Sequence, residues 1–549
     1  MATFLTNPFP LFIFFFLVSY PVSLFASSTN QIISCLTQYK INNFTTFPIR
    51  TNNSSTYYYH LLNFSIQNLR FTDSWVPKPL AIVLPKSVEE ISNTVLCCRR
   101  LSLEIRVRCG GHSYEGTSAF ASDGASFLII DMINLNKVAV DLTSETAWVG
   151  GGATLGETYY AIAEASNVHG FSAGSCPTVG VGGHIGGGGF GLLSRKYGVA
   201  ADHVVDALLV DANGRLLNRE GMGEDVFWAI RGGGGGVWGI VYAWKIKLIK
   251  VPKIVTSFII SRQGTKSHVE NLVNKWQHIA PNLIDDFYIT CFVGAGLPEA
   301  EKIGEISATF KGFYLGPRNE ALSIVKQAFP DVQLGEEDCK EMSWIESILF
   351  FSGLSKGSSI LDLKNRYLQD KNYFKAKSDY VKTPISASGI SSLVESLENE
   401  AKGYVILDPY GGTMERISGE DIPFPHRKGN LFTIQYLVAW YEEDNDKSKK
   451  YIEWIRDLYG KMTEFVSWGP RCAYINYMDI DLGEMELINS SDQNEDAVEI
   501  ARVWGEKYFL KNYDRLVKAK TIIDPNNVFT NQQGIPPMSN HFVRIKSEE

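Results

Sequence analysis

Residues 109–116 read CGGHSYEG and residues 173–191 read AGSCPTVGVGGHIGGGGFG, and these two stretches are unusually rich in glycine. Glycine adopts positive φ angles and lets backbone amides approach an anion closely. A third stretch, RGGGGGVWG at residues 231–239, has the same character. We therefore expect the three stretches to form loops that cradle a diphosphate.

Two of these stretches contain the spacing G-x-G-x-x-G, at residues 186–191 and 234–239. A Rossmann fingerprint also requires a strand before the glycines, a helix after them and an acidic residue about 20 positions later. Neither stretch opens a convincing helix in such a unit, so a simple Rossmann domain is disfavoured. The sequence also lacks a G-x-x-x-x-G-K-[ST] motif, which excludes a P-loop.

The glycine-rich stretches lie within a region, residues 77–252, that alternates short apolar runs with turn residues. The runs at 80–85, 127–132, 147–152, 203–217 and 239–251 predict strands. Residues 87–101 have apolar side chains at helical spacing, with Ser87 as the expected N-cap, and residues 155–166 repeat the pattern. This alternation is typical of an α+β or α/β domain.

Residues 253–469 differ, because glycine is sparse and long amphipathic segments appear. Helices are predicted at 267–280 and 390–401, and strands at 303–316, 375–384 and 430–441. This pattern indicates a second domain in which helices cover a sheet. From residue 470 onward, one long amphipathic helix is expected over residues 498–524.

Length, composition and charge indicate the number of structural units and restrict the class of binding partner. At 549 residues the chain should form two or three structural units, and 45% hydrophobic with 20% charged residues is typical of a globular protein. The formal net charge is −8 and no dense basic run occurs, which argues against a nucleic-acid partner.

The N-terminus indicates a secreted protein. Residues 1–27 contain the apolar run LFIFFFLVSY followed by small residues, as in a cleaved secretory signal. The alternative is an uncleaved anchor, because the first ten residues carry no Lys or Arg; no other run approaches the length of a spanning helix. Glycosylation sequons begin at Asn43, Asn52, Asn53, Asn63 and Asn489.

Eight cysteines occur, and an oxidising compartment would permit disulfides. Their spacing does not fix the connectivity. No C-x-x-C pair has a matching Cys or His pair, so no metal site is expected. A lone His or Cys is usually structural, but His112 and Cys176 both lie in glycine-dense loops, and this shared setting points to a family.

The chain resembles the plant berberine bridge enzyme-like flavoproteins, which have the vanillyl-alcohol-oxidase type of FAD fold. The resemblance is nearly full length and includes IQNLRF (66–71), PYGGTMERIS (409–418), NYMDIDLG (476–483) and DPNNVFTNQQGIPP (524–537). In that family the corresponding histidine bonds the 8α carbon of the flavin and the cysteine bonds C6. The resemblance thus implies FAD attached to both His112 and Cys176, a disulfide between Cys35 and Cys97, and an unmatched Cys98.

The same resemblance implies the domain layout. An FAD-binding domain would span residues 72–250, a substrate domain with a helix-covered antiparallel sheet residues 251–469, and residues 470–538 would return to the FAD domain. The residues expected to contact the flavin, besides the two tethers, are Gly110, Gly111, Ser113, Val179, Gly180, Gly182, Gly183, His184, Gly239, Tyr474 and Asn476.

For catalysis the resemblance points to Tyr477 as the base, with a stacking aromatic as the alternative. Tyr114 and Thr433 would line the substrate pocket. Berberine bridge enzyme itself carries a carboxylate base at the position of Gln435. Because glutamine is a poor proton acceptor, C–C bridging is disfavoured and Gln435 is interpreted as a polar anchor.

Three positions bear on the reaction. Phe190 replaces a common tyrosine and removes a hydroxyl from the pocket wall. Met478 replaces a common arginine that could support a phenolate at Tyr477. Val179 is the smaller of the family's usual choices and leaves room for oxygen beside the flavin, so we expect an oxidase that releases hydrogen peroxide.

The pocket aromatics favour a flat aromatic substrate, and we expect an alkaloid amine, such as a tetrahydroprotoberberine-type isoquinoline, to be oxidised to an iminium. The alternatives are a carbohydrate or aromatic alcohol oxidase, and, from another class, a non-redox cyclase or an FAD-bearing defence protein. We further expect a monomer without a membrane anchor, in the apoplast or in a vesicle or vacuole derived from the secretory pathway.

Overall fold

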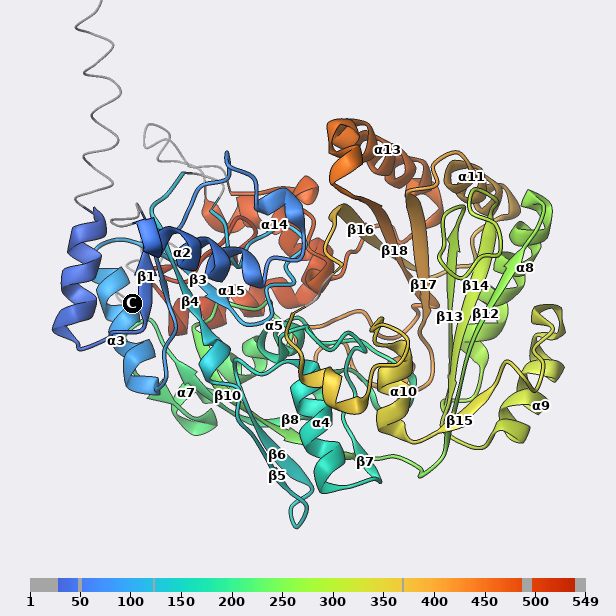
Figure 1. The fold of residues 1–549 in the computed structure, drawn as a ribbon, viewed down its shortest axis with the longest axis horizontal. Helices are drawn as coiled ribbons and strands as arrows, with labels where there is room; N and C mark the ends of the chain where they lie inside the picture. Colours follow the sequence, from blue (N-terminus) through green and yellow to red (C-terminus); the bar gives the residue numbers. More distant parts are fainter. Residues whose placement is uncertain (1–27, 48–51, 122–123, 368–369, 486–495, 539–549) are drawn as a thin grey trace, which may run out of the picture.

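The computed structural model describes residues 28–47, 52–121, 124–367, 370–485 and 496–538. Figure 1 shows two lobes: one combines the first part of the chain with the last helices, and the other holds a large sheet. The expected signal segment and the sequon at Asn489 lie outside the described residues.

Two sheets organise the first lobe. The four-stranded sheet has the order β1 (Phe44–Thr46), β2 (Ala81–Val83), β4 (Phe127–Asp131) and β3 (Glu104–Arg108), and the pairs β2–β4 and β3–β4 are parallel. The five-stranded sheet is antiparallel, in the order β5 (Val138–Asp141), β6 (Thr146–Gly150), β10 (Ile240–Lys247), β8 (Val204–Val210) and β9 (Leu216–Leu217). A further pair joins β7 (His169–Gly170) to β11 (Ile249–Lys250).

The second lobe is built on one seven-stranded antiparallel sheet, as expected. Its order is β15 (Lys340–Met342), β12 (Val255–Gln263), β14 (Ser307–Tyr314), β13 (Phe287–Gly294), β17 (Gly403–Pro409), β18 (Phe432–Trp440) and β16 (Tyr373–Val381). The helices α8 (Lys266–Ile279), α11 (Ala387–Glu398) and α13 (Ser448–Lys461) pack with it in one hydrophobic core. In Figure 1 these helices lie on the outer side of the lobe, so the opposite sheet face is directed toward the first lobe.

Local sequence accounts for the helix boundaries. The helix α3 (Val88–Arg100) begins at the expected N-cap, because the Ser87 side chain accepts a hydrogen bond from the Glu90 N–H at 3.3 Å. The helix α4 (Leu155–Ala165) begins with a capping box between Thr154 and Glu157. The remaining longer helices are α2 (Asn52–Phe64), α7 (Arg219–Ile230), α9 (Arg318–Ala328) and α10 (Trp344–Phe351).

The prediction of a single helix over residues 498–524 is wrong. The structure has two helices, α14 (Ala497–Phe509) and α15 (Tyr513–Ile523), separated where Leu510 adopts a positive φ of 49°. The break lets the chain fold back on itself, so that the Tyr513 ring packs on Gly505, where a Cβ would meet it at 2.3 Å. A helical pattern of hydrophobic residues continues across such a break and cannot show it.

The end of the chain packs against the first lobe. The helix α15 contacts α7, and the buried ammonium group of Lys520 donates to the Val237 carbonyl at 2.7 Å and to the Asp524 carboxylate at 2.8 Å. Arg106 on β3 donates to the Thr530 carbonyl at 2.8 Å. Residues more than 400 positions apart therefore form one wall of this lobe.

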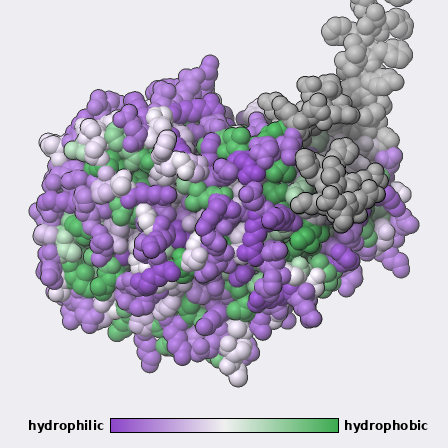
Figure 2. Space-filling view, turned by 180° about the vertical axis from the view of Figure 1, so that it is seen from behind, coloured by the Kyte–Doolittle hydropathy of each residue, from purple (hydrophilic) through white to green (hydrophobic). Residues whose placement is uncertain are grey.

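The structure contains the expected disulfide between Cys35 and Cys97, with Cys98 free and buried. Of the sequons, Asn43 and Asn63 have half-buried side chains, and the Asn43 amide nitrogen donates to the Leu84 carbonyl at 2.8 Å. No helix among the described residues is both long and apolar enough to cross a membrane. The face shown in Figure 2 is mainly hydrophilic, with hydrophobic side chains in separate small groups.

Replacing both Cys35 and Cys97 by Ala should destabilise the protein by about 2–4 kcal/mol, because the disulfide closes a long loop in the unfolded chain. Thermal unfolding with and without reductant measures the effect, and Cys98→Ala is the matched control. Reductant should lower the melting temperature of the wild type and of Cys98→Ala but not of the double variant. An unchanged wild-type melting temperature under reductant would contradict this expectation.

Candidate functional site

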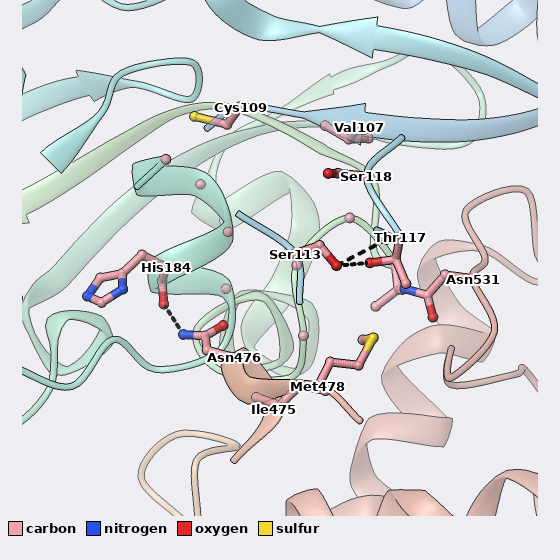
Figure 3. A pocket seen from close by; sticks show the side chains of 18 of the residues that line it. Val107, Cys109, Ser113, Thr117, Ser118, His184, Ile475, Asn476, Met478 and Asn531 are labelled. Carbon is pink, nitrogen blue, oxygen red and sulfur yellow. Dashed lines mark hydrogen bonds between the residues drawn. The ribbon is translucent and has the colours of Figure 1, made fainter. Parts of the chain in front are cut away.

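A cavity of about 420 Å³ lies in the first lobe, where the three glycine-rich stretches meet. Its walls come from β3, the loop after it, the helix α5 (Val181–Gly186), residues 233–239 and the C-terminal residues 530–535. Most of the expected flavin contacts line it, namely Gly110, Gly111, His112, Ser113, Cys176, Val179, Gly180, Gly182, Gly183, His184, Gly239 and Asn476. Figure 3 shows part of this lining.

Two of the loops approach each other more closely than side chains would permit. A Cβ on Gly110 would lie 2.3 Å from the Gly180 backbone nitrogen, and a Cβ on Gly180 would lie 2.4 Å from the Gly110 nitrogen. Gly111 adopts a φ of +70° and its Cβ would meet the Ser65 carbonyl at 2.2 Å. Glycine is therefore required at these positions, both for conformation and for space.

The helix α4 fixes the second loop. The N–H groups of Leu155 and Gly156, in its first turn, donate to the carbonyls of Val179 and Pro177, each at 2.9 Å. These N–H groups have no partner within their own helix. The loop that carries Cys176 is thus held by the end of a helix rather than left free.

Thr178 joins the two expected tethers. Its Oγ1 atom lies 2.8 Å from the Nε2 atom of His112 and 3.7 Å from the sulfur of Cys176. Burial, with smaller contributions from Lys371 and His184, lowers the pKa of His112 to about 4. Burial raises the pKa of the Cys176 thiol. At neutral pH the imidazole is therefore uncharged and the thiol protonated.

The cavity walls leave space where a flavin nucleotide would need it. A Cβ added to Gly183 would meet nothing within 4 Å, and one on Gly236 would meet only Val107, at 3.9 Å. Both glycines line the cavity, so side chains there would fill it. Gly182 and Gly183, in the first turn of α5, also line the cavity. These features fit an elongated, anionic cofactor such as FAD.

Tyr474 and Asn476 join the C-terminal segment to the glycine loops. The Tyr474 hydroxyl accepts hydrogen bonds from the N–H groups of Gly189 and Phe190, at 3.0 and 3.2 Å. The Asn476 amide donates to this hydroxyl and to the His184 carbonyl, each at 3.0 Å. The latter bond is drawn in Figure 3. Tyr474 itself is not part of the cavity lining.

On the side of the second lobe the cavity ends at two stacked phenols. The rings of Tyr114 and Tyr477 are nearly parallel, with an interplanar angle of 4° and centroids 5.3 Å apart. Gln435, on β18, donates a hydrogen bond to the Tyr114 hydroxyl. Burial raises the pKa of both phenols, so each is protonated at neutral pH.

Asn68, within the IQNLRF stretch, anchors the backbone of Tyr114. Its amide donates to the carbonyl of Tyr114 at 2.8 Å and to the carbonyl of Phe374 at 3.0 Å. The side chain thereby links the loop of the first lobe to β16 of the second. The stretch is recognisable in the sequence as a family motif, whereas this contact between the lobes depends on the fold.

A buried ion network involves residues that are close to both phenols in the chain. The ammonium group of Lys375 contacts the carboxylates of Glu115 and Asp479, and Lys377 contacts Asp479 and Asp481 at 2.7 Å. Glu115 follows Tyr114 in the chain and Asp479 lies two residues after Tyr477. Because buried charges are stable only when paired, the network holds both phenols against β16.

The remaining pocket residues lie along the same sheet face. Phe190 stacks on Tyr410 with centroids 5.0 Å apart. Thr433 is two residues before Gln435 on β18, and its hydroxyl donates to the Asp379 carbonyl at 2.9 Å. Neither Phe190 nor Thr433 lines the main cavity.

Comparisons with known proteins agree with this geometry. A family model described as FAD binding domain matches residues 79–219, and one described as Berberine and berberine like matches residues 473–536. The chain is 62% identical over 527 residues to Berberine bridge enzyme-like D-2 of Nicotiana tabacum, covering 94% of this chain and 93% of that protein. The chain belongs to the berberine bridge enzyme-like family.

Two further matches are to proteins whose names describe an enzyme. Reticuline oxidase of Eschscholzia californica is 48% identical over 512 residues, covering 93% of this chain and 92% of its own length. The solved structure of berberine bridge enzyme from Eschscholzia californica matches with a TM-score of 0.88 at 48% identity, covering 93% of this chain and 99% of that one. The protein is thus an FAD-linked oxidoreductase of that fold.

Sequence reasoning missed several residues on the sheet face that is directed toward the cavity. They are Tyr288 on β13, Tyr404 and Asp408 on β17, and Tyr410 just after β17. The period-two pattern of YVILDP could have placed Asp408 opposite the buried Val405 and Leu407. No strand was predicted at residues 403–409, so this pattern was not applied there.

Gly110→Ala should abolish flavin loading, because the new Cβ would lie 2.3 Å from the Gly180 nitrogen and force the two loops apart. The ratio of flavin to protein absorbance after purification measures this. Gly460→Ala, in α13, is the matched control, since its Cβ meets nothing within 4 Å, and it should load flavin fully. Full loading of Gly110→Ala would show that the close approach of the loops is not required.

Proposed function

We propose that the protein is an FAD-dependent oxidase that holds its flavin by covalent bonds to His112 and Cys176. We further propose that it oxidises an aromatic amine of alkaloid type to an iminium and passes the electrons to O2 as hydrogen peroxide. The observation that carries the proposal is the placement of His112 and Cys176 on either side of Thr178, in the wall of one cavity that ends at the Tyr114–Tyr477 pair.

The protonation state of His112 supports its attachment to the flavin. With a pKa of about 4, His112 is a neutral imidazole with a lone pair at physiological pH. The contact between its Nε2 atom and Thr178 leaves Nδ1 as the nitrogen available to form a bond. Cys176 lies on the same wall, and its thiol must lose its proton to react, since the thiolate is the nucleophilic form.

The flavin, when bound, would accept a hydride from the carbon beside the substrate nitrogen. The residues of the chain supply binding and orientation. Tyr114 and Tyr477 offer parallel aromatic faces at the end of the cavity, and Gln435 fixes Tyr114 by its hydrogen bond. An aromatic substrate stacked there is held in one plane.

For Tyr477 we propose a stacking and hydrogen-bonding role rather than that of a base. Burial raises its pKa well above the ordinary value, and Tyr114 and Asp408 raise it further. A phenol with these neighbours donates a hydrogen bond and is a poor proton acceptor. Met478 follows it where an arginine could have stabilised a phenolate.

The proposal also covers the electron acceptor, the compartment, the substrate class and the oligomeric state. The small side chain of Val179 on the cavity wall favours access of O2 to the flavin. The disulfide is consistent with synthesis in the secretory pathway. The name of the relative reticuline oxidase supports an alkaloid amine as the substrate class. We expect the enzyme to act as a monomer.

The test is a screen of amines against the holoenzyme, with peroxide release and anaerobic bleaching of the flavin as readouts. We expect a tetrahydroisoquinoline alkaloid to release one peroxide per iminium formed, whereas oligosaccharides and benzylic alcohols should not. Turnover of a sugar or alcohol without turnover of any amine would contradict the proposed substrate class. Bleaching without peroxide would contradict the oxidase.

Two substitutions separate the possible roles of Tyr477. Tyr477→Phe keeps the ring, so the turnover number should stay within about tenfold of wild type, whereas Tyr477→Ala should raise KM by losing the stacked face. If Tyr477 were the base, Tyr477→Phe would lower the turnover number by about 10²-fold or more. Steady-state kinetics with the best amine decides between them.

A further inference from the structure

Asp408 is a buried carboxylate on the substrate side of the large sheet. On β17, its neighbours Val405 and Leu407 belong to the hydrophobic core under the helices, so Asp408 is directed to the other face by strand alternation. It pairs with Thr433 on β18, and Ile406 pairs with Gln435. Asp408 and Gln435 are therefore diagonal neighbours on one face, about 7–8 Å apart.

The carboxylate has no cationic partner in the part of the chain that the structure describes. No Lys, Arg or His nitrogen there lies within 4.0 Å of it, although only 7% of Asp408 is exposed. Its Oδ1 atom accepts a hydrogen bond from the Tyr288 hydroxyl. Burial raises the pKa of this carboxyl, although its hydrogen bonds with Tyr288 and Thr290 act in the opposite direction. Buried carboxylates in proteins are ordinarily paired with a cation. The site of Asp408 therefore lacks the cation that such a group usually has.

Aromatic rings surround the carboxylate. Burial raises the pKa of Tyr288, Tyr410 and Tyr477, and the nearby charge of Asp408 adds to the rise at each. Tyr477 lines the cavity and Tyr410 stacks on Phe190. A carboxylate among phenol rings is a favourable site for an organic ammonium ion, because ring faces attract cations.

We propose that Asp408 binds the ammonium group of the incoming substrate and takes up its N–H proton, so that the amine is neutral when the adjacent carbon gives up a hydride. The site therefore selects amines that arrive in their protonated form. The inference rests on the proposed function and deepens it by naming the charge state that is recognised. Gln435 occupies a position that offers no negative charge. On the neighbouring strand β17, Asp408 supplies a carboxylate on the same face, opposite Thr433 rather than opposite Gln435.

The binding test uses two probes of equal shape, 1,2,3,4-tetrahydroisoquinoline, a cation at neutral pH, and isochroman, its neutral ether counterpart. Binding to the holoenzyme is followed by the change in flavin absorption. The wild type should bind the cation at least about tenfold more tightly than the ether, because a desolvated charge pair is worth more than a neutral contact. Asp408→Asn keeps the shape and should lose this preference.

Tyr288→Phe is the matched control, since it alters the surroundings of Asp408 but leaves the carboxylate in place. This variant should still prefer the cation. The inference is overturned if Asp408→Asn loads flavin and keeps the preference, if the wild type shows none, or if neither probe binds. Preferential binding of the cation without oxidation of any amine would instead retain this inference and contradict the proposed function.

Discussion

The close backbone contact between Gly110 and Gly180 is the constraint on which the rest of the site depends. It brings the loop after β3 and the loop before α5 together, and Thr178 then lies between His112 and Cys176. Neither loop could approach so closely with a side chain in between. The glycines at these positions are therefore not a flexible hinge, because they permit a fixed contact that a Cβ would abolish.

The second constraint is electrostatic and acts across the two lobes. Lys375 and Lys377 extend from β16 into the carboxylates of Glu115, Asp479 and Asp481. Since Tyr114 and Tyr477 are close in the chain to these acids, the network sets how the substrate sheet meets the flavin cavity. A buried network of this kind favours one arrangement because every alternative would leave a charge unpaired.

The sequence predicted those features that depend on local interactions. The helix capped by Ser87 and the strand containing Gln435 follow from spacing and capping alone. The disulfide and the return of the C-terminal segment came only from the family resemblance, because contacts such as that of Arg106 with Thr530 join distant residues. The break at Leu510 escaped prediction, since the packing of Tyr513 on Gly505 leaves the hydrophobic pattern unchanged. Asp408 escaped it because the strand that carries it, Gly403–Pro409, was not predicted.

Attachment of one flavin to both loops is tested most directly by flavin retention after acid precipitation. In the wild type the yellow colour should stay in the denatured pellet. His112→Ala and Cys176→Ala should each retain colour through the other bond, and only the double variant should release free FAD to the supernatant. A colourless wild-type pellet, with all of the FAD in solution, would contradict covalent attachment of the flavin.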